Sequence, residues 1–163
     1  MQTGLETLEA LDRLDQRISW TMRRIGPWLL RLSLGVVFIW FGALKPLGLS
    51  PANELVARTV VWFPPGVFLP ILGVWEVAIG VCLLLKPLNR VGILLLLLQM
   101  PGTMLPLVLL PEVCFVHAPL VPTIEGQYII KNLVLISAAI VVGGWVREAS
   151  VLSGARASAP GIE

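Results

Sequence analysis

Charged residues are scarce in this sequence. Asp, Glu, Lys and Arg make up 13% of its 163 residues, whereas soluble domains contain about 25%. Hydrophobic residues make up 56% and the mean hydropathy is +0.87. One membrane span needs about 20 apolar residues, so the length accommodates four spans and leaves little for a soluble domain. We therefore expect an all-α membrane protein, a bundle of four transmembrane helices in the lipid bilayer. We expect no nucleic-acid partner.

The motifs of common redox cofactors are absent too. The sequence has no Cys-x-x-Cys, no pair of haem-ligating histidines and no nucleotide fingerprint. We expect Cys82 and Cys114 at opposite ends of the membrane, beyond the Cα separation of about 4.4–6.8 Å that a disulfide requires, and hence as free thiols. Cys114 and His117 form a Cys-x-x-His pair, which supplies half of the four ligands usual for zinc. We expect no metal site.

A cleavable signal peptide is not visible, because the first 20 residues carry four acids and lack an uninterrupted apolar core. Apolar residues in this region instead recur at spacings of three and four, as is typical of an amphipathic helix. They are Leu5, Leu8, Leu11, Leu14 and Ile18. Residues 1–26 are predicted to form a cytoplasmic amphipathic helix that either lies at the membrane interface or docks a partner protein.

Four apolar stretches predict spans at about residues 28–47, 67–85, 91–110 and 127–146. They form a bundle over residues 27–147. The loop between the first two spans contains an apolar segment, residues 56–63, which predicts a short interfacial helix or a re-entrant turn. Residues 148–163 are rich in Ala, Ser and Gly and predict a disordered cytoplasmic tail.

Basic residues indicate the orientation of the spans. They concentrate in the N-terminal segment, in the turn at residues 86–90 and in the tail. An even number of spans places these three segments on one side of the membrane. The positive-inside rule therefore predicts that both termini are cytoplasmic.

The second predicted span carries an acid, Glu76, near its middle. Gly73 and Gly80 lie on the same helix face as this acid, and Gly35 and Gly42 share one face of the first span. Small residues let neighbouring helices approach closely in a membrane. The four glycines are therefore predicted helix-packing positions.

Glu76 has two interpretations. It is either a buried acid that fastens helices together, or a contact for a proton, ligand or cofactor, because ionisable residues inside spans are functional candidates by default. Gln99, in the third predicted span, lies at a similar depth. We expect a hydrogen bond between the two side chains.

Cations are expected to approach Glu76 from the outer side of the membrane. Side chains lean toward the N-terminus of their own helix, so Lys45 leans into the membrane and Glu76 leans toward the outer half. Lys131 lies one turn below the outer surface in the fourth span. These directions predict an outer-half polar pocket. The candidate ligand or proton site residues are Glu76, Lys45, Lys131, Tyr128, Gln99 and Asn132.

Three stretches together resemble the DoxX-like superfamily, and within it the YkgB-type branch of small bacterial membrane proteins. They are LRLSLGVVFIWFGALK, LGVWEVAIGVCLLL and EGQYIIKNLVLISAA. Their shared order is Phe-Gly-x-x-Lys, then Gly-x-x-Glu, then Glu-Gly followed by Lys-Asn. The resemblance covers residues 28–146 and implies a four-helix bundle in the bacterial inner membrane.

The resemblance also implies a redox association. DoxX-like proteins include quinone-linked subunits of thiosulfate oxidation and membrane subunits of oxidative-stress complexes. We therefore expect an accessory subunit of such a complex, with a protein partner or a second copy, and with a quinone-like lipid in the polar pocket. The alternative is a non-catalytic scaffold that docks a larger membrane complex. A transporter is disfavoured, because four spans without a visible repeat lack the usual paired halves.

Overall fold

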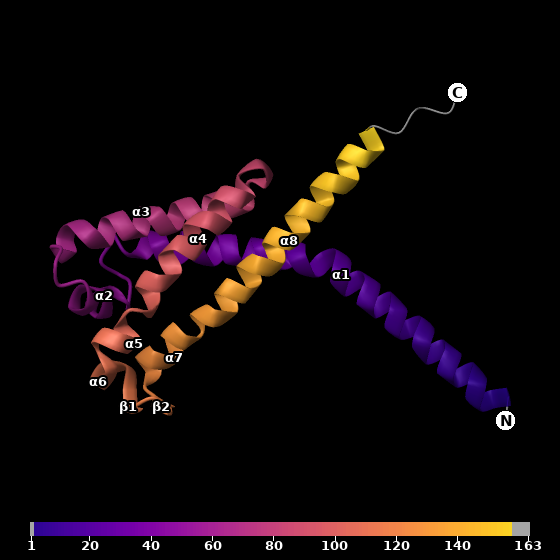
Figure 1. Cartoon of the computed structure of the whole chain (residues 1–163), viewed down its shortest axis with the longest axis horizontal. Coiled ribbons are helices and arrows are strands. Elements are labelled where there is room, and N and C mark those ends of the chain that lie inside the picture. Colours follow the sequence, from indigo (N-terminus) through magenta and orange to yellow (C-terminus); the bar gives the residue numbers. More distant parts are fainter. Residues whose placement is uncertain (1, 158–163) are drawn as a thin grey trace.

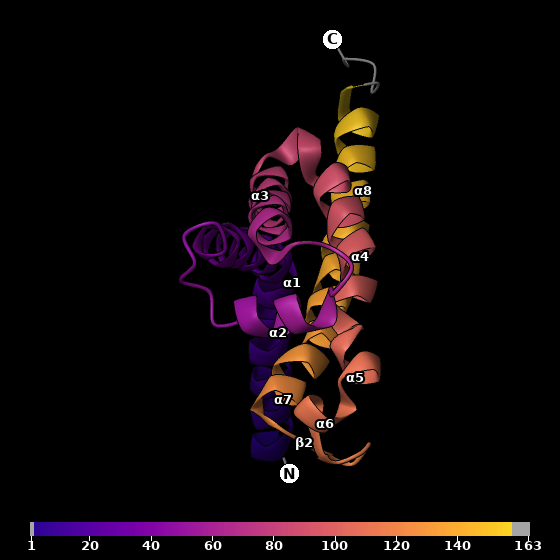
Figure 2. The same ribbon diagram turned by 90° about the vertical axis from the view of Figure 1, so that its left-hand side faces the viewer.

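The computed structural model describes residues 2–157 of the chain and the side chains of residues 11–145. Its long helices are α1 Gln2–Leu44, α3 Pro65–Leu84, α4 Asn89–Met104 and α8 Asn132–Ala157. They pack in a ring, in which α1 contacts α3 and α8, and α4 contacts the same two helices (Figures 1 and 2). Within the described residues, four helical segments are long and apolar enough to cross a membrane. The predicted all-α four-helix membrane bundle is confirmed.

Shorter elements connect the long helices at the two ends of the bundle. They are α2 Asn53–Thr59, η1 Lys86–Leu88, α5 Pro106–Leu109, α6 Pro111–Cys114, the antiparallel strands β1 Phe115–His117 and β2 Val121–Pro122, and α7 Ile124–Ile130. We call the end with η1, from which the N-terminal half of α1 and the C-terminal half of α8 extend, the turn end (Figure 1). The opposite end, with α2, α5 to α7 and the two strands, is the loop end.

Two of the spans are composite. The third runs from Lys86 to Leu109, because η1 and α5 extend α4 in both directions. The fourth runs from Ile124 to Trp145 and is interrupted at Lys131, where α7 ends and α8 begins. Of the two alternatives expected for residues 56–63, a short helix is present as α2, but it begins earlier, at Asn53, and ends at Thr59.

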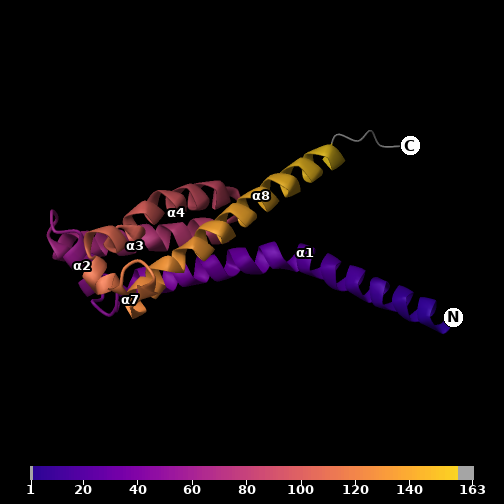
Figure 3. The same cartoon turned by 60° about the horizontal axis from the view of Figure 1, so that its bottom comes forward.

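The N-terminal amphipathic segment is not a separate helix. The sequence predicted a boundary near residue 26, but α1 continues through Pro27 without a break. Pro27 removes one backbone hydrogen bond, which bends a helix without necessarily ending it, and α1 changes direction on leaving the bundle (Figures 1 and 3). At 43 residues, α1 is about 65 Å long, twice the ~30 Å of the bilayer core. Its N-terminal half therefore projects beyond the bundle.

The C-terminal tail also differs from the prediction. Residues 148–157 were expected to be disordered, but α8 continues to Ala157. This segment contains Ala, Leu, Arg and Glu, which have high helix propensity, and no proline interrupts it. Residues 158–163 lie outside the described part of the chain.

The predicted packing glycines bring α1 and α3 into backbone contact. A Cβ atom at Gly73 would lie 2.6 Å from the Gly42 carbonyl oxygen, and one at Gly80 would lie 2.5 Å from the Gly35 carbonyl oxygen. Only hydrogen fits at such separations. The core of the bundle lies beside this contact and draws on all four long helices: Leu34, Phe38, Ile79, Leu83, Leu96, Met100, Ala138, Ala139 and Val142.

We expect Gly73→Ala to destabilise the bundle by about 1–3 kcal/mol, because the added methyl group overpacks the contact between α1 and α3. Thermal unfolding in detergent measures the effect. Gly102→Ala is the control, because nothing lies within 4 Å of a Cβ atom there. Equal stability of the two variants would contradict the packing role.

Candidate functional site

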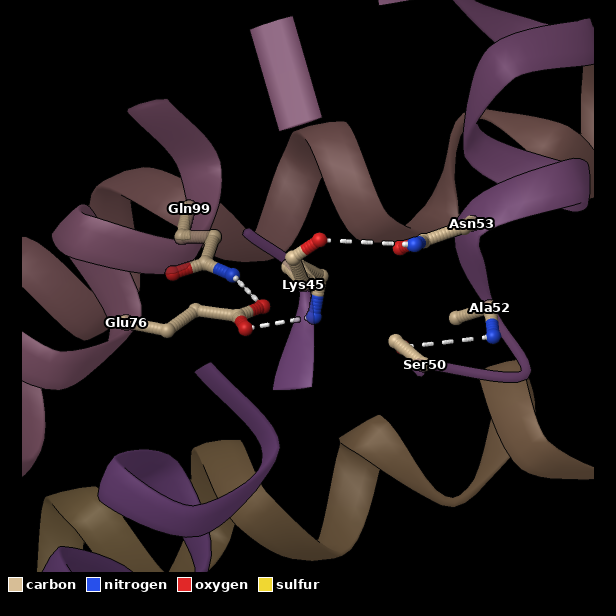
Figure 4. Close-up of polar contacts among 6 residues, drawn as sticks. All are labelled: Lys45, Ser50, Ala52, Asn53, Glu76 and Gln99. Carbon is tan, nitrogen blue, oxygen red and sulfur yellow. Dashed lines mark hydrogen bonds and ion pairs between the residues drawn. The ribbon is translucent and has the colours of Figure 1, made fainter. Parts of the chain in front are cut away.

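A buried ion pair joins α1 to α3. Lys45 Nζ lies 2.5 Å from Glu76 Oε2, and the two residues are 7% and 8% exposed (Figure 4). Charges removed from water are unfavourable unless they are paired and hydrogen-bonded, and here each compensates the other. The expected approach of Lys45 to Glu76 is confirmed.

The backbone at the end of α1 positions Lys45. It is the first residue after the helix, and Gly48 follows with a φ of +71°, in the left-handed region that favours glycine. This turn leads the chain to α2, where Asn53 Nδ2 donates a hydrogen bond of 3.5 Å to the Lys45 carbonyl oxygen (Figure 4). The Lys45 side chain thereby returns into the bundle.

Gln99 completes the site from a third helix, α4. Its Nε2 atom donates a 2.7 Å hydrogen bond to Glu76 Oε1, so both carboxylate oxygens of Glu76 are engaged. The predicted hydrogen bond is confirmed. We refer to Lys45, Glu76 and Gln99 as the polar cluster. It ties α1, α3 and α4 together by charge-assisted contacts.

Two acceptors beside the polar cluster lack a donor. Gln99 Oε1 and Asn53 Oδ1 are both buried, and neither accepts a hydrogen bond from the described residues. A buried acceptor without a partner costs about 1–3 kcal/mol. The polar cluster can therefore accept a hydrogen bond from a water molecule or from a ligand hydroxyl group.

Lys131 and Tyr128 do not join the polar cluster, so the predicted polar pocket is wrong in respect of these two residues. Both side chains are exposed, and Lys131 Nζ lies 5.0 Å from the centroid of the Tyr128 ring as a cation–π pair. The reason is helical geometry. Lys131 follows the buried Ile129 by two residues, which corresponds to about 200° around a helix.

Asn132, another candidate site residue, also lies outside the polar cluster. Its Nδ2 atom donates a 3.1 Å hydrogen bond to Thr103 Oγ1, which ties the start of α8 to the end of α4. Sequence reasoning missed Thr103, although it follows Gln99 by four residues and so shares its helix face. It also missed Asn53, which lies beyond a loop and has no spacing that relates it to Glu76.

Both cysteines are free, as predicted, but Cys114 is not accessible, although it precedes the loop strands. Cys114 is fully buried, because Gly126 packs on its carbonyl oxygen and Thr123 N donates to that oxygen at 2.9 Å. Burial raises the pKa of the Cys114 thiol above its ordinary value, and Glu125 and Glu112 add to the rise. His117 is exposed, so one residue of the Cys-x-x-His pair is buried and the other faces outward.

The fold defines the class of the protein, a multi-pass membrane protein built as a four-helix bundle around a buried ion pair. Comparisons with family models, with curated proteins and with solved structures found no match to the chain. Its function is therefore inferred from its own residues.

The two lysines permit a matched test. Lys45→Met should destabilise the bundle by about 3–5 kcal/mol, because it leaves the Glu76 carboxylate buried without its cation. Lys131→Met changes an exposed side chain and should stay within about 0.5 kcal/mol of the parent. Thermal unfolding in detergent compares the two. Equal losses would mean that Lys131 also supports the polar cluster.

Cys114 should resist alkylation in the folded protein. In a Cys82→Ser variant, we expect N-ethylmaleimide to label Cys114 slowly in mild detergent and rapidly after denaturation in dodecyl sulfate. Because the pKa of the thiol is raised and the thiolate is the nucleophile, the rate in the folded state should rise only at a higher pH than for free cysteine. Labelling of the folded protein at the rate of free cysteine would contradict the burial.

Proposed function

We propose that this protein is a non-catalytic accessory subunit of a membrane complex, in which the polar cluster holds the bundle together and α1 docks the partner. The observation that carries the proposal is the closure of the polar cluster. Both oxygens of Glu76 are engaged by Lys45 and Gln99, and these contacts link three helices. An acid engaged in this way serves assembly better than proton exchange.

The projecting half of α1 supports a docking role. Leu11, Leu14 and Ile18 lie at helical spacing and are 61%, 55% and 45% exposed. An apolar stripe on a helix that extends past the bundle fits the groove of a partner protein or a second copy of this chain. The side chains of Leu5 and Leu8, which would continue the stripe, lie outside the described side chains.

The DoxX-like and YkgB-type resemblance assigns the complex to redox or oxidative-stress chemistry in a bacterial inner membrane. The charge distribution supports cytoplasmic termini by the positive-inside rule. Basic residues on the turn-end side are Arg13, Arg17, Arg23, Arg24, Lys86 and Arg90. The loop end carries fewer basic residues, namely Lys45, Arg58 and Lys131.

A quinone-type ligand is a second candidate function, favoured by the unpaired acceptors beside the polar cluster. The hydroxyl group of a reduced quinone donates a hydrogen bond, and Gln99 Oε1 lacks a donor. Lys45 Nζ has further protons to offer the carbonyl oxygen of an oxidised quinone.

Purification from native membranes in mild detergent tests the proposal. We expect the tagged chain to retain a stoichiometric protein partner, or to form a homo-oligomer on light scattering. The triple variant Leu11→Gln, Leu14→Gln, Ile18→Gln should lose this association and keep the thermal stability of the bundle. The matched control is Leu120→Gln, because Leu120 is 86% exposed at the loop end. A triple variant that retains the partner would overturn the docking role.

A charge-neutral double variant separates the two candidate functions. Lys45→Met with Glu76→Gln removes both charges and keeps a hydrogen bond to Gln99, so it should restore much of the stability that Lys45→Met alone loses. If the polar cluster only fastens helices, the double variant keeps its partner. If it binds a quinone, the parent yields extractable quinone by mass spectrometry and the double variant does not.

A further inference from the structure

A second buried cation, Arg31, lies in α1 apart from the polar cluster. Arg31 is 7% exposed, and its Nε atom is buried without an acceptor. No hydrogen bond or ion pair joins its guanidinium group to any of the described side chains. The guanidinium group of arginine carries a positive charge.

The position of Arg31 follows from the register of α1 against α3. Gly42 contacts Gly73, and Gly35 contacts Gly80, so the two antiparallel helices keep a constant pairing. The same pairing places Arg31 opposite Leu84, two residues before Lys86. Arg31 therefore lies at the turn end of the bundle, where α1 and α3 run side by side (Figure 3).

No acid with a described side chain is free and near enough to neutralise Arg31. Asp15 precedes it by 16 residues, about 24 Å along the helix. Glu76 lies about 12 Å away by the same pairing and is already bonded to Lys45 and Gln99. An unpaired buried charge is strongly unfavourable, so the compensating anion comes from outside these residues.

The surroundings of Arg31 favour a lipid phosphate as this anion. Trp28 lies one turn before Arg31 and is 45% exposed, and tryptophan marks the headgroup level of a bilayer. Lys86 and Arg90 are exposed at the same end and add positive charge. A guanidinium group binds phosphate oxygens in bidentate fashion, and basic sites between helices on the cytoplasmic side bind anionic headgroups.

We propose that Arg31 is the central contact of a binding site for the phosphate group of an anionic phospholipid, at the turn end of the bundle, where α1 packs against α3. The lipid headgroup neutralises a guanidinium group that the described side chains leave unpaired. Its acyl chains lie against the apolar surface of the bundle. The site is separate from the polar cluster and does not depend on the function proposed for it.

Native mass spectrometry of delipidated protein tests the site. The parent is titrated with phosphatidylglycerol and phosphatidylcholine that carry identical acyl chains. We expect the parent to bind the anionic lipid preferentially, by about tenfold or more for a charge-assisted contact, and Arg31→Gln to lose this preference. Arg58→Gln is the matched control, because Arg58 is an exposed arginine at the loop end. An unchanged preference in Arg31→Gln would overturn the proposal.

Thermal stability gives a second test, in which the parent and Arg31→Met are compared without lipid and with added phosphatidylglycerol. In lipid-free detergent, Arg31→Met should be at least as stable as the parent, because it removes an unpaired charge. Added phosphatidylglycerol should then raise the melting temperature of the parent and not that of the variant. A variant less stable than the parent in lipid-free detergent would overturn the proposal, because it would reveal a partner inside the protein.

Two further arms exclude other anions. Inorganic phosphate at millimolar concentration should not reproduce the effect of the lipid, and if it did, the site would belong to a free phosphate. Glu148 lies in the part of α8 whose side chains are not described. If Glu148→Gln abolished the lipid preference as Arg31→Gln does, this acid would act with Arg31 and the lipid assignment would be wrong.

Discussion

The close contact between α1 and α3 is the constraint on which the rest of the structure depends. Gly42 and Gly73 bring the two backbones together. Because the helices are antiparallel, Lys45 and Glu76 lie one turn to either side of this contact, and the close approach lets the Lys45 side chain reach Glu76. The ion pair in turn orients Glu76 toward Gln99, which attaches α4. Because both charges are buried in an apolar bundle, separating the helices would leave each of them unpaired. The contact and the ion pair therefore stabilise the same helix arrangement.

The two ends of the bundle differ in whether a buried cation has a partner among the described side chains. At the loop end, Lys45 is paired within the chain, and the short elements cover Cys114 completely. At the turn end, Arg31 is equally buried and the described side chains offer it no anion. We relate this difference to position. A cation deep among helices needs an internal partner, whereas one at the headgroup level can use a lipid phosphate.

The prediction from sequence succeeded where one helix face decided the outcome. Gly73, Glu76 and Gly80 share a face by spacing alone, and the structure buries all three. It failed where the rotation of a whole helix mattered. Lys131 lies in the loop-end part of the fourth span, as expected, but the buried Ile129 turns it away from Glu76. The position of a residue along its span can be read from the sequence. The direction in which a helix face points depends on the helices packed against it.

The sequence by itself determined four apolar spans and the position of each polar residue along its span, because these properties depend on local composition and length. Only the tertiary structure decided which polar residues meet. It paired Asn132 with Thr103, buried Cys114 under a turn, and carried α1 through Pro27 as one helix. The physical reason is that contacts between helices depend on their relative rotation and register, which arise from packing all four together.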